Sequence, residues 1–205
     1  MYTIKEIFYT LQGEGANAGK AAVFVRFSGC NLWSGREQDR ATAVCKFCDT
    51  DFIGGLKFAT AEQVVNAALD VTPDHTGVNI MAVFTGGEPG LQLDEKLVAL
   101  FRGEGFYTAI ETNGTVKLPE GLDWICCSPK AYTVLALDTA NELKLVYPQD
   151  NVEPKDLNWF RAETRWLSPM DGTHLKENTE KAVTYCLNNP EWRLNLQAHK
   201  VWSIP

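Results

Sequence analysis

The sequence has no excess of positive charge and no long apolar run. Its 205 residues include 19 Lys and Arg against 26 Asp and Glu, a formal net charge of −7. A protein that holds nucleic acid through a broad basic face is therefore not expected, although a local basic pocket is compatible with this charge. No apolar stretch reaches the length of a membrane span, and residues 1–15 lack the pattern of a signal peptide. We expect a cytoplasmic protein that binds neither membrane nor nucleic acid.

Six cysteines are present, although a chain of this size can bury a core without disulfides. In a reducing compartment, free thiols or metal-bound thiolates are more natural than disulfides. Three of the cysteines, Cys126, Cys127 and Cys186, lie in apolar patterns and are interpreted as buried core residues. The other three need a different explanation.

Short apolar runs alternate with helical patterns along the chain. The expected strands cover 21–30, 78–84, 107–112, 123–128, 142–147, 165–168 and 194–199, and the expected helices cover 61–71, 93–101, 152–160 and 179–187. This alternation favours a parallel α/β sheet. The chain is shorter than the roughly 250 residues of a full eight-stranded barrel. We therefore expect one domain, residues 1–205, that forms an incomplete TIM-like barrel of about six parallel strands with few helices.

The most informative cysteines flank residues 31–57, the longest stretch without a regular pattern. Cys30 ends an apolar strand, and the pair Cys45 and Cys48 follows after 14 intervening residues. Loops of this length are usually functional or tied down. Three thiolates are one fewer than the four that close a structural zinc site or saturate an iron-sulfur cluster. The spacing leaves a cluster, a zinc site and a redox dithiol open. Zinc would need a fourth ligand brought by folding, such as His75, His174 or His199.

Other polar motifs follow the apolar runs. The segment 85–89, Thr-Gly-Gly-Glu-Pro, comes directly after an expected strand, where α/β folds bind ligands. Its glycines allow close approach to the backbone, and Glu88 disfavours phosphate and suits an ammonium group; a plain tight turn is the alternative. Arg26 within an apolar strand is either an edge residue or a clamp for a carboxylate.

Taken together, these motifs resemble the radical S-adenosylmethionine (SAM) superfamily, and more narrowly the family of 7-carboxy-7-deazaguanine synthases. The motifs that carry the resemblance are Leu11-Gln-Gly-Glu-Gly15, Arg26-Phe-Ser-Gly-Cys30, Cys48-Asp-Thr50, Thr85-Gly-Gly-Glu-Pro89, Glu111-Thr-Asn-Gly114, Ser128-Pro-Lys130 and the segment from His199 to Pro205. They extend over nearly the whole chain. The first cysteine gap is longer here than is usual in the superfamily, which bears on how the loop packs and on which reductase docks there.

The resemblance implies a [4Fe-4S] cluster on Cys30, Cys45 and Cys48, with SAM completing it at the open iron. An electron from the cluster would cleave SAM to a 5′-deoxyadenosyl radical, which abstracts hydrogen from 6-carboxy-5,6,7,8-tetrahydropterin. Ring contraction and loss of ammonia would then give 7-carboxy-7-deazaguanine, a precursor of queuosine-type bases of tRNA. SAM would be regenerated, and Mg²⁺ would be the second metal.

The resemblance also assigns residues. SAM would meet Phe47, Cys48, Asp49, Gly87, Ser128, Pro129, Lys130, Ser168, Pro169, Met170 and Asp171, and the pterin would meet Leu11, Gln12, Gly13, Arg26, Thr85 and the terminal carboxylate of Pro205. Thr50 would bind Mg²⁺, and Glu14, Glu111 and His199 are candidates for proton handling. The implied partners are a flavodoxin or ferredoxin as electron donor and a second copy in a homodimer. A glycyl-radical-enzyme activase and a zinc-stabilised binding module are the competing hypotheses.

Overall fold

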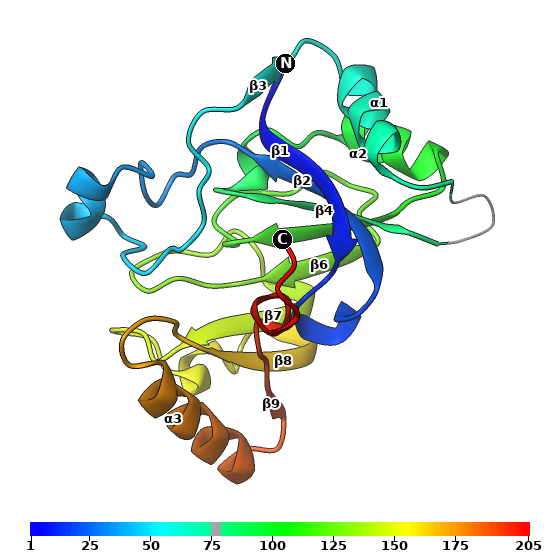
Figure 1. Cartoon of the computed structure of the whole chain (residues 1–205). Helices are drawn as coiled ribbons and strands as arrows, with labels where there is room; N and C mark the ends of the chain where they lie inside the picture. Colours follow the sequence, from blue (N-terminus) through cyan, green and yellow to red (C-terminus); the bar gives the residue numbers. More distant parts are fainter. Residues whose placement is uncertain (75–78) are drawn as a thin grey trace.

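The computed structural model describes residues 1–74 and 79–205, and its strands form one nine-stranded sheet in the order β3-β1-β2-β4-β5-β6-β7-β8-β9 (Figure 1). The strands are β1 Tyr2–Leu11, β2 Ala21–Phe27, β3 Leu56–Phe58, β4 Met81–Gly86, β5 Tyr107–Thr112, β6 Trp124–Cys127, β7 Thr139–Tyr147, β8 Arg161–Pro169 and β9 Trp192–Leu194. The α-helices are α1 Ala61–Val71, α2 Glu95–Gly103, α3 Leu175–Asn188 and α4 Ala198–Trp202. Short 3₁₀ helices occupy Gly15–Asn17, Glu37–Thr42, Pro89–Leu91 and Pro154–Leu157.

The sheet is mostly parallel. The strands β2, β4, β5, β6, β7, β8 and β9 each run parallel to their neighbours in this series. The strand β1 pairs antiparallel with both β2 and β3. No pairing between β3 and β9 closes the sheet within the described residues. This arrangement confirms the expected partial barrel with few helices. Among residues 1–74 and 79–205, no helix is long and apolar enough to cross a membrane.

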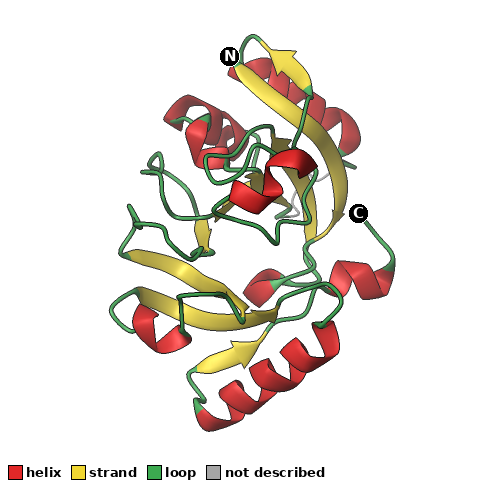
Figure 2. Ribbon diagram, turned by 90° about the vertical axis from the view of Figure 1, so that its left-hand side faces the viewer, coloured by secondary structure: helices red, strands yellow, loops and turns green. Residues whose placement is uncertain are grey.

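Helices cover one face of the sheet. The helices α1 and α2 pack on each other and on β1 and β5, while α3 packs along β8 and β9 at the other end (Figure 2). The covered face holds the larger apolar core, with Val25, Phe84 and Phe101 fully buried. The opposite face has a smaller apolar cluster around Met81 and Val83. Functional side chains can therefore gather on this inner face, at the carboxyl ends of the parallel strands.

The helix α1 begins where its sequence pattern predicts. The hydroxyl of Thr60 accepts a hydrogen bond from the backbone N–H of Gln63, and the Gln63 side chain accepts from the backbone N–H of Thr60, both at 3.4 Å. This capping box satisfies N–H groups that have no partner within the helix. The residues Val64 and Ala68 are buried in the larger core, as their helical spacing predicts.

Several expected elements differ from the structure. The expected strand over 194–199 is wrong, because β9 ends at Leu194 and α4 starts at Ala198. The expected helix over 152–160 is only the short 3₁₀ helix Pro154–Leu157. The long loop contains one 3₁₀ helix and ends in β3, and the antiparallel strand β1 was not expected. Residue 78, expected in a strand, lies outside the described residues, and β4 begins at Met81.

Candidate active site

The three cysteines of the motif line one cavity of about 220 Å³. Cys30 follows β2, and Cys45 and Cys48 return to it from the far end of the long loop. All six cysteines carry free thiols. Within the described part of the chain, no three Cys, His, Asp or Glu side chains converge on a single metal ion.

The long loop is held closed by Arg40. Its guanidinium donates to the backbone carbonyls of Lys46 at 2.8 Å and Cys48 at 3.0 Å, and it stacks 4.1 Å above the ring of Trp33. That ring in turn packs edge-on against Phe52 at a centroid distance of 5.6 Å. The loop of 14 residues between the first two cysteines is therefore tied down on the residues it must position.

Two of the thiols are electrostatically unequal. A hydrogen bond from Cys45 lowers the pKa of Cys48 to about 6, and the same bond raises the pKa of Cys45. Burial raises the pKa of Cys30. Metal binding requires thiolates, and Cys48 is the one of these three thiols that ionises most readily.

The Thr-Gly-Gly-Glu-Pro turn lies against the first cysteine. The backbone N–H of Glu88 donates to the carbonyl of Gly29 at 2.9 Å. A side chain at Gly87 would collide with that same carbonyl and lie 2.9 Å from Cβ of Cys30, so only glycine allows this approach. The turn therefore presents bare backbone to the cavity beside the cysteines.

Glu88 supports this turn from inside. Its fully buried carboxylate accepts from the Thr112 hydroxyl at 2.8 Å, the Asn113 backbone N–H at 2.7 Å and the Gly90 backbone N–H at 2.9 Å. Burial raises its pKa. The expectation that Glu88 creates a site for an ammonium group is not supported, because its oxygens hold the end of β5 and it lines neither main cavity.

Most of the expected SAM residues line the cavity that the cysteines line. These residues are Phe47, Cys48, Asp49, Gly87, Ser128, Lys130, Ser168, Pro169 and Asp171. The other two, Pro129 and Met170, are not on its wall, although the backbone of both is fixed by hydrogen bonds to Gln149 and Tyr147. Lys130 donates to the carbonyl and the hydroxyl of Ser128 at 2.6 and 2.7 Å.

A second cavity of about 530 Å³ adjoins the first. Every expected pterin residue lines it: Leu11, Gln12, Gly13, Arg26, Thr85 and Pro205. The β2–β4 register places Arg26 beside Thr85. Arg26 is half-buried and donates to Glu6 at 2.7 Å, so it has an anionic partner. Both cavities share a wall made of Glu14, Asp49, Thr50, Thr85, Glu111, Lys144 and Gln197.

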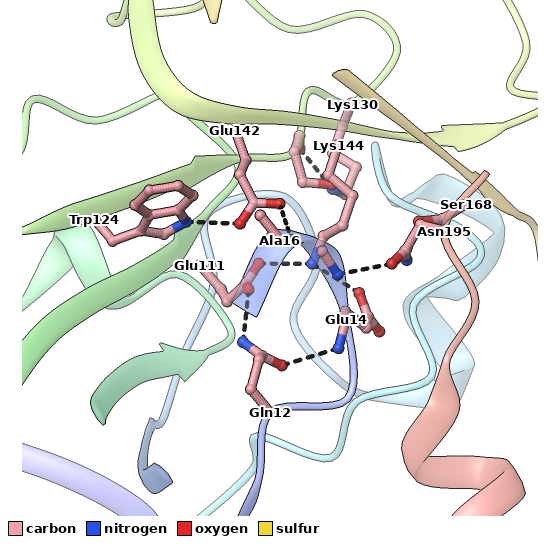
Figure 3. Close-up of polar contacts among 12 residues, drawn as sticks. Gln12, Glu14, Ala16, Glu111, Trp124, Lys130, Glu142, Lys144, Ser168 and Asn195 are labelled. Atoms are coloured by element: carbon pink, nitrogen blue, oxygen red, sulfur yellow. Dashed lines mark hydrogen bonds and ion pairs between the residues drawn. The ribbon is translucent and has the colours of Figure 1, made fainter. Parts of the chain in front are cut away.

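The centre of this wall is an ion-paired network (Figure 3). The ammonium of Lys144 on β7 lies 2.7 Å from Glu14 and 2.8 Å from Glu111, and Gln12 donates to Glu111 at 3.3 Å. Burial by itself raises the pKa of Glu14, but the charge and hydrogen bond of Lys144, together with His199 and Gln197, outweigh it and hold that pKa below its usual value. The network therefore keeps a carboxylate ionised between the cavities.

The turn after β1 is anchored to distant strands. Asn195 accepts from the backbone N–H of Gly15 at 2.8 Å and donates to Ser168 at 2.7 Å. Glu142 accepts from the Trp124 indole at 2.6 Å and from the backbone N–H of Ala16 at 3.0 Å (Figure 3). Asn195 makes a last ladder bond, from its backbone N–H to the carbonyl of Leu167 at 2.8 Å, while its side chain binds the turn after β1.

The helix α4 closes the larger cavity. Ala198 donates its backbone N–H to Gly13 at 3.0 Å, which places His199 on the cavity wall. A side chain at Gly13 would lie 2.5 Å from Nδ1 of His199, so glycine permits this contact. Lys200 bridges Asp49 of the long loop, at 3.0 Å, and Asp171.

Sequence reasoning missed Lys144, Gln197 and Asn195. Lys144 carries only a weak signal as a charge inside an expected strand, because the alternation of Glu142, Leu143, Lys144 and Leu145 is also typical of a half-exposed strand. Gln197 and Asn195 carry none, since polar residues near a chain's end are usually solvated. The three missed residues all contact the turn at 12–15 or line its cavity.

The sheet is an open, mostly parallel barrel, and three thiols from the end of β2 and the loop after it share a cavity with the glycine turn that follows β4. This combination defines a radical SAM enzyme. The donor set fits the implied cofactors: three thiols face one cavity, and bare backbone and polar side chains line the same space. The crystal structure of QueE from Escherichia coli superposes with a TM-score of 0.71 at 28% identity, covering 97% of this chain and 94% of that one.

Curated relatives specify the family. The chain is 53% identical over 209 residues to 7-carboxy-7-deazaguanine synthase of Caulobacter vibrioides and 51% identical to that of Bordetella pertussis, covering 100% of this chain and 99% of each relative. A search of protein-family models gives no match. The chain belongs to the 7-carboxy-7-deazaguanine synthase family. This membership replaces the glycyl-radical activase and the zinc module as interpretations.

Proposed function

We propose that this chain converts 6-carboxy-5,6,7,8-tetrahydropterin to 7-carboxy-7-deazaguanine and ammonia. The observation that carries the proposal is the wall shared by the two cavities, which brings a ligand beside the cysteines next to a ligand beside Arg26. Transfer of a hydrogen atom between two bound molecules requires this kind of contact. When bound, the cluster and SAM supply the radical that abstracts this hydrogen.

Each cavity has the chemistry of its proposed ligand. The smaller cavity offers the thiols and the backbone at Gly87 to the cluster and to the methionine part of SAM, with Ser128 and Lys130 for its polar groups. The larger cavity offers Arg26 to the pterin carboxylate and the acceptors Glu14 and Glu111 to the pterin N–H groups. His199 lies on the same wall, within reach of a proton on a substrate in this cavity.

A divalent cation is proposed at Thr50. This residue lies on the wall between the two cavities, with Asp49 and Asp51 as its neighbours in sequence. Mg²⁺ keeps several waters and uses few protein ligands, so a single hydroxyl together with a substrate carboxylate suits it.

Three further assignments rest on the family resemblance. A flavodoxin or ferredoxin is proposed as electron donor, because a low-potential cluster needs a one-electron donor. A homodimer in the cytoplasm is proposed, where reducing conditions preserve the free thiols that all six cysteines carry.

Anaerobic turnover tests the proposal. The reconstituted enzyme, a chemical reductant, SAM and 6-carboxytetrahydropterin should yield 7-carboxy-7-deazaguanine and equimolar ammonia, without consuming SAM and with a lower rate when Mg²⁺ is omitted. The matched control is Cys45→Ala, which should give neither product. Absence of the deazaguanine from an enzyme with full iron content and bound SAM would overturn the proposed function.

A further inference from the structure

Lys144 lies on the wall that the two cavities share, where three segments distant in sequence meet. Its side chain is 9% exposed, and its ammonium bridges Glu14, which follows β1, and Glu111 on β5. The three residues carry one positive and two negative charges, so one negative charge remains at the wall that faces both cavities.

Stability alone does not account for this ion pair. Removing two charges from water costs about as much as their attraction returns, and apolar replacements of buried pairs are often neutral or stabilising. Elsewhere on the inner face, residues such as Met81 and Val83 are apolar and well buried. Apolar residues in place of the whole network would therefore suit the fold, and the network calls for a role in the cavity.

The geometry of the carboxylates indicates that role. Lys144 takes Oε2 of Glu14 and Oε2 of Glu111, while Gln12 donates to the other oxygen of Glu111. Hydrogen bonds from Lys144 and Gln12 thus hold the two carboxylates in place, and both carboxylates line the larger cavity. A tetrahydropterin offers amino and ring N–H donors, which need ionised acceptors at fixed positions.

The charge of Lys144 also favours the ionised form of Glu14. Burial alone would raise the pKa of Glu14, and Lys144, together with His199 and Gln197, reverses this. Burial also lowers the pKa of Lys144, but Cys126, Glu111 and Glu14 raise it well above its usual value. The lysine therefore stays charged wherever the enzyme is folded and works as a fixed positive charge.

We propose that Lys144 is a positioning residue that presents Glu14 and Glu111 to the pterin as an oriented pair of acceptors. This inference rests on the proposed function, because it takes the pterin as the ligand of the larger cavity. The titratable groups that face this network are Glu14, Glu111, Cys126 and Glu142, with His199 beside Glu14.

The test compares Lys144→Met with the wild type, both as reconstituted holoenzyme. Pterin binding, SAM binding and iron content are measured anaerobically from pH 6 to pH 9. Loss of charge-assisted hydrogen bonds should raise the Kd and the KM of the pterin by about 10-fold to 100-fold at neutral pH. Iron content and SAM affinity should stay at the wild-type value.

The pH profile separates positioning from a purely structural role. Without the ammonium, the Glu14 carboxylate loses the charge that favours its ionised form and is protonated more easily, so the pterin affinity of Lys144→Met should recover as the pH rises toward 9. Lys144→Arg keeps the charge and should keep the wild-type profile. The exposed Lys96, which pairs with Glu62 on the outer helices, supplies the control Lys96→Met, which should change nothing.

Three outcomes overturn the inference: unchanged pterin affinity, a loss that is equal at every pH, or a parallel loss of SAM affinity. If Lys144→Met fails to fold, the single variant Glu14→Gln is compared with the double variant Glu14→Gln plus Lys144→Met. The double variant removes one charge of each sign. The double variant should bind pterin more weakly and with a higher pH midpoint; equal binding would overturn the inference. A wild-type enzyme that binds no pterin would instead refute the proposed function.

Discussion

Arg40 should control how firmly the cysteine loop closes. It is the residue that joins the carbonyls of Lys46 and Cys48 to the ring of Trp33, and its side chain is 29% exposed. The substitution Arg40→Met keeps an apolar stem over the ring but removes the donors. Arg40 belongs to none of the apolar clusters that form the core of the described residues. The main unfolding transition of the sheet should therefore stay unchanged in Arg40→Met.

The magnitude follows from the contacts that are lost. Hydrogen bonds from a charged donor contribute about 1.5–3 kcal/mol each, and a cation over an aromatic ring adds about 0.5–1 kcal/mol at an exposed site. Because water competes with a partly exposed guanidinium, we expect the loop to lose about 2–3 kcal/mol in total. That loss corresponds to a rise of about 30-fold to 150-fold in the ratio of open to closed loop.

Extraction of iron by an excess of chelator under anaerobic conditions measures this ratio, provided that iron leaves through the open loop. The rate of iron extraction from Arg40→Met should rise by up to about 30-fold to 150-fold relative to the wild type. The rate from Arg40→Lys should lie between those of Arg40→Met and the wild type. Arg161→Met is the control, since Arg161 pairs with Asp138 but lies exposed at the start of β8. An extraction rate equal to that of the wild type would refute the assigned role of Arg40.

Three further predictions concern the site. Cys45→Ala should lose the cluster and all SAM cleavage while circular dichroism shows an intact fold; retained cleavage would reject Cys45 as a ligand. Thr50→Val should abolish the stimulation of turnover by Mg²⁺ but leave SAM affinity unchanged, and a persisting stimulation would place the cation elsewhere. The folded pKa of Glu14 lies below its ordinary 4.5, so its carboxylate stabilises the fold above that pH and this contribution is lost as pH falls through the folded value. The stability of the wild type relative to Glu14→Gln should therefore decrease only below about pH 5, and an unchanged difference in acid would contradict this assignment.

Local patterns in the sequence were sufficient for much of the frame. The capping box at Thr60 predicted where α1 begins, and the apolar runs predicted the parallel strands β2, β4, β5, β6, β7 and β8. The family resemblance predicted that the cysteines and the glycine turn share a site, and both line one cavity. These features are local because a cap, a strand period and a two-residue cysteine gap each depend on neighbours in the chain.

Other features required the tertiary structure. The segment 194–199 alternates like a strand, yet Asn195 and Ala198 bind the turn after β1, because pairing partners far away in sequence outweigh a short pattern. Likewise, Pro129 and Met170 belong to matched segments, but the direction of each side chain depends on how the segment packs.

The sequence by itself indicated the class of chemistry through motifs that together resemble the radical SAM superfamily, whereas the cysteine spacing alone left a cluster, a zinc site and a redox dithiol open. Only the tertiary structure decided which charges meet at the wall between the two cavities. The sequence shows Lys144 as a charge inside an expected strand, but its partners come from the turn after β1, which holds Glu14, and from β5, which holds Glu111. The energetics of a buried charge depend on which opposite charges meet it, and that is a property of long-range register and not of local pattern.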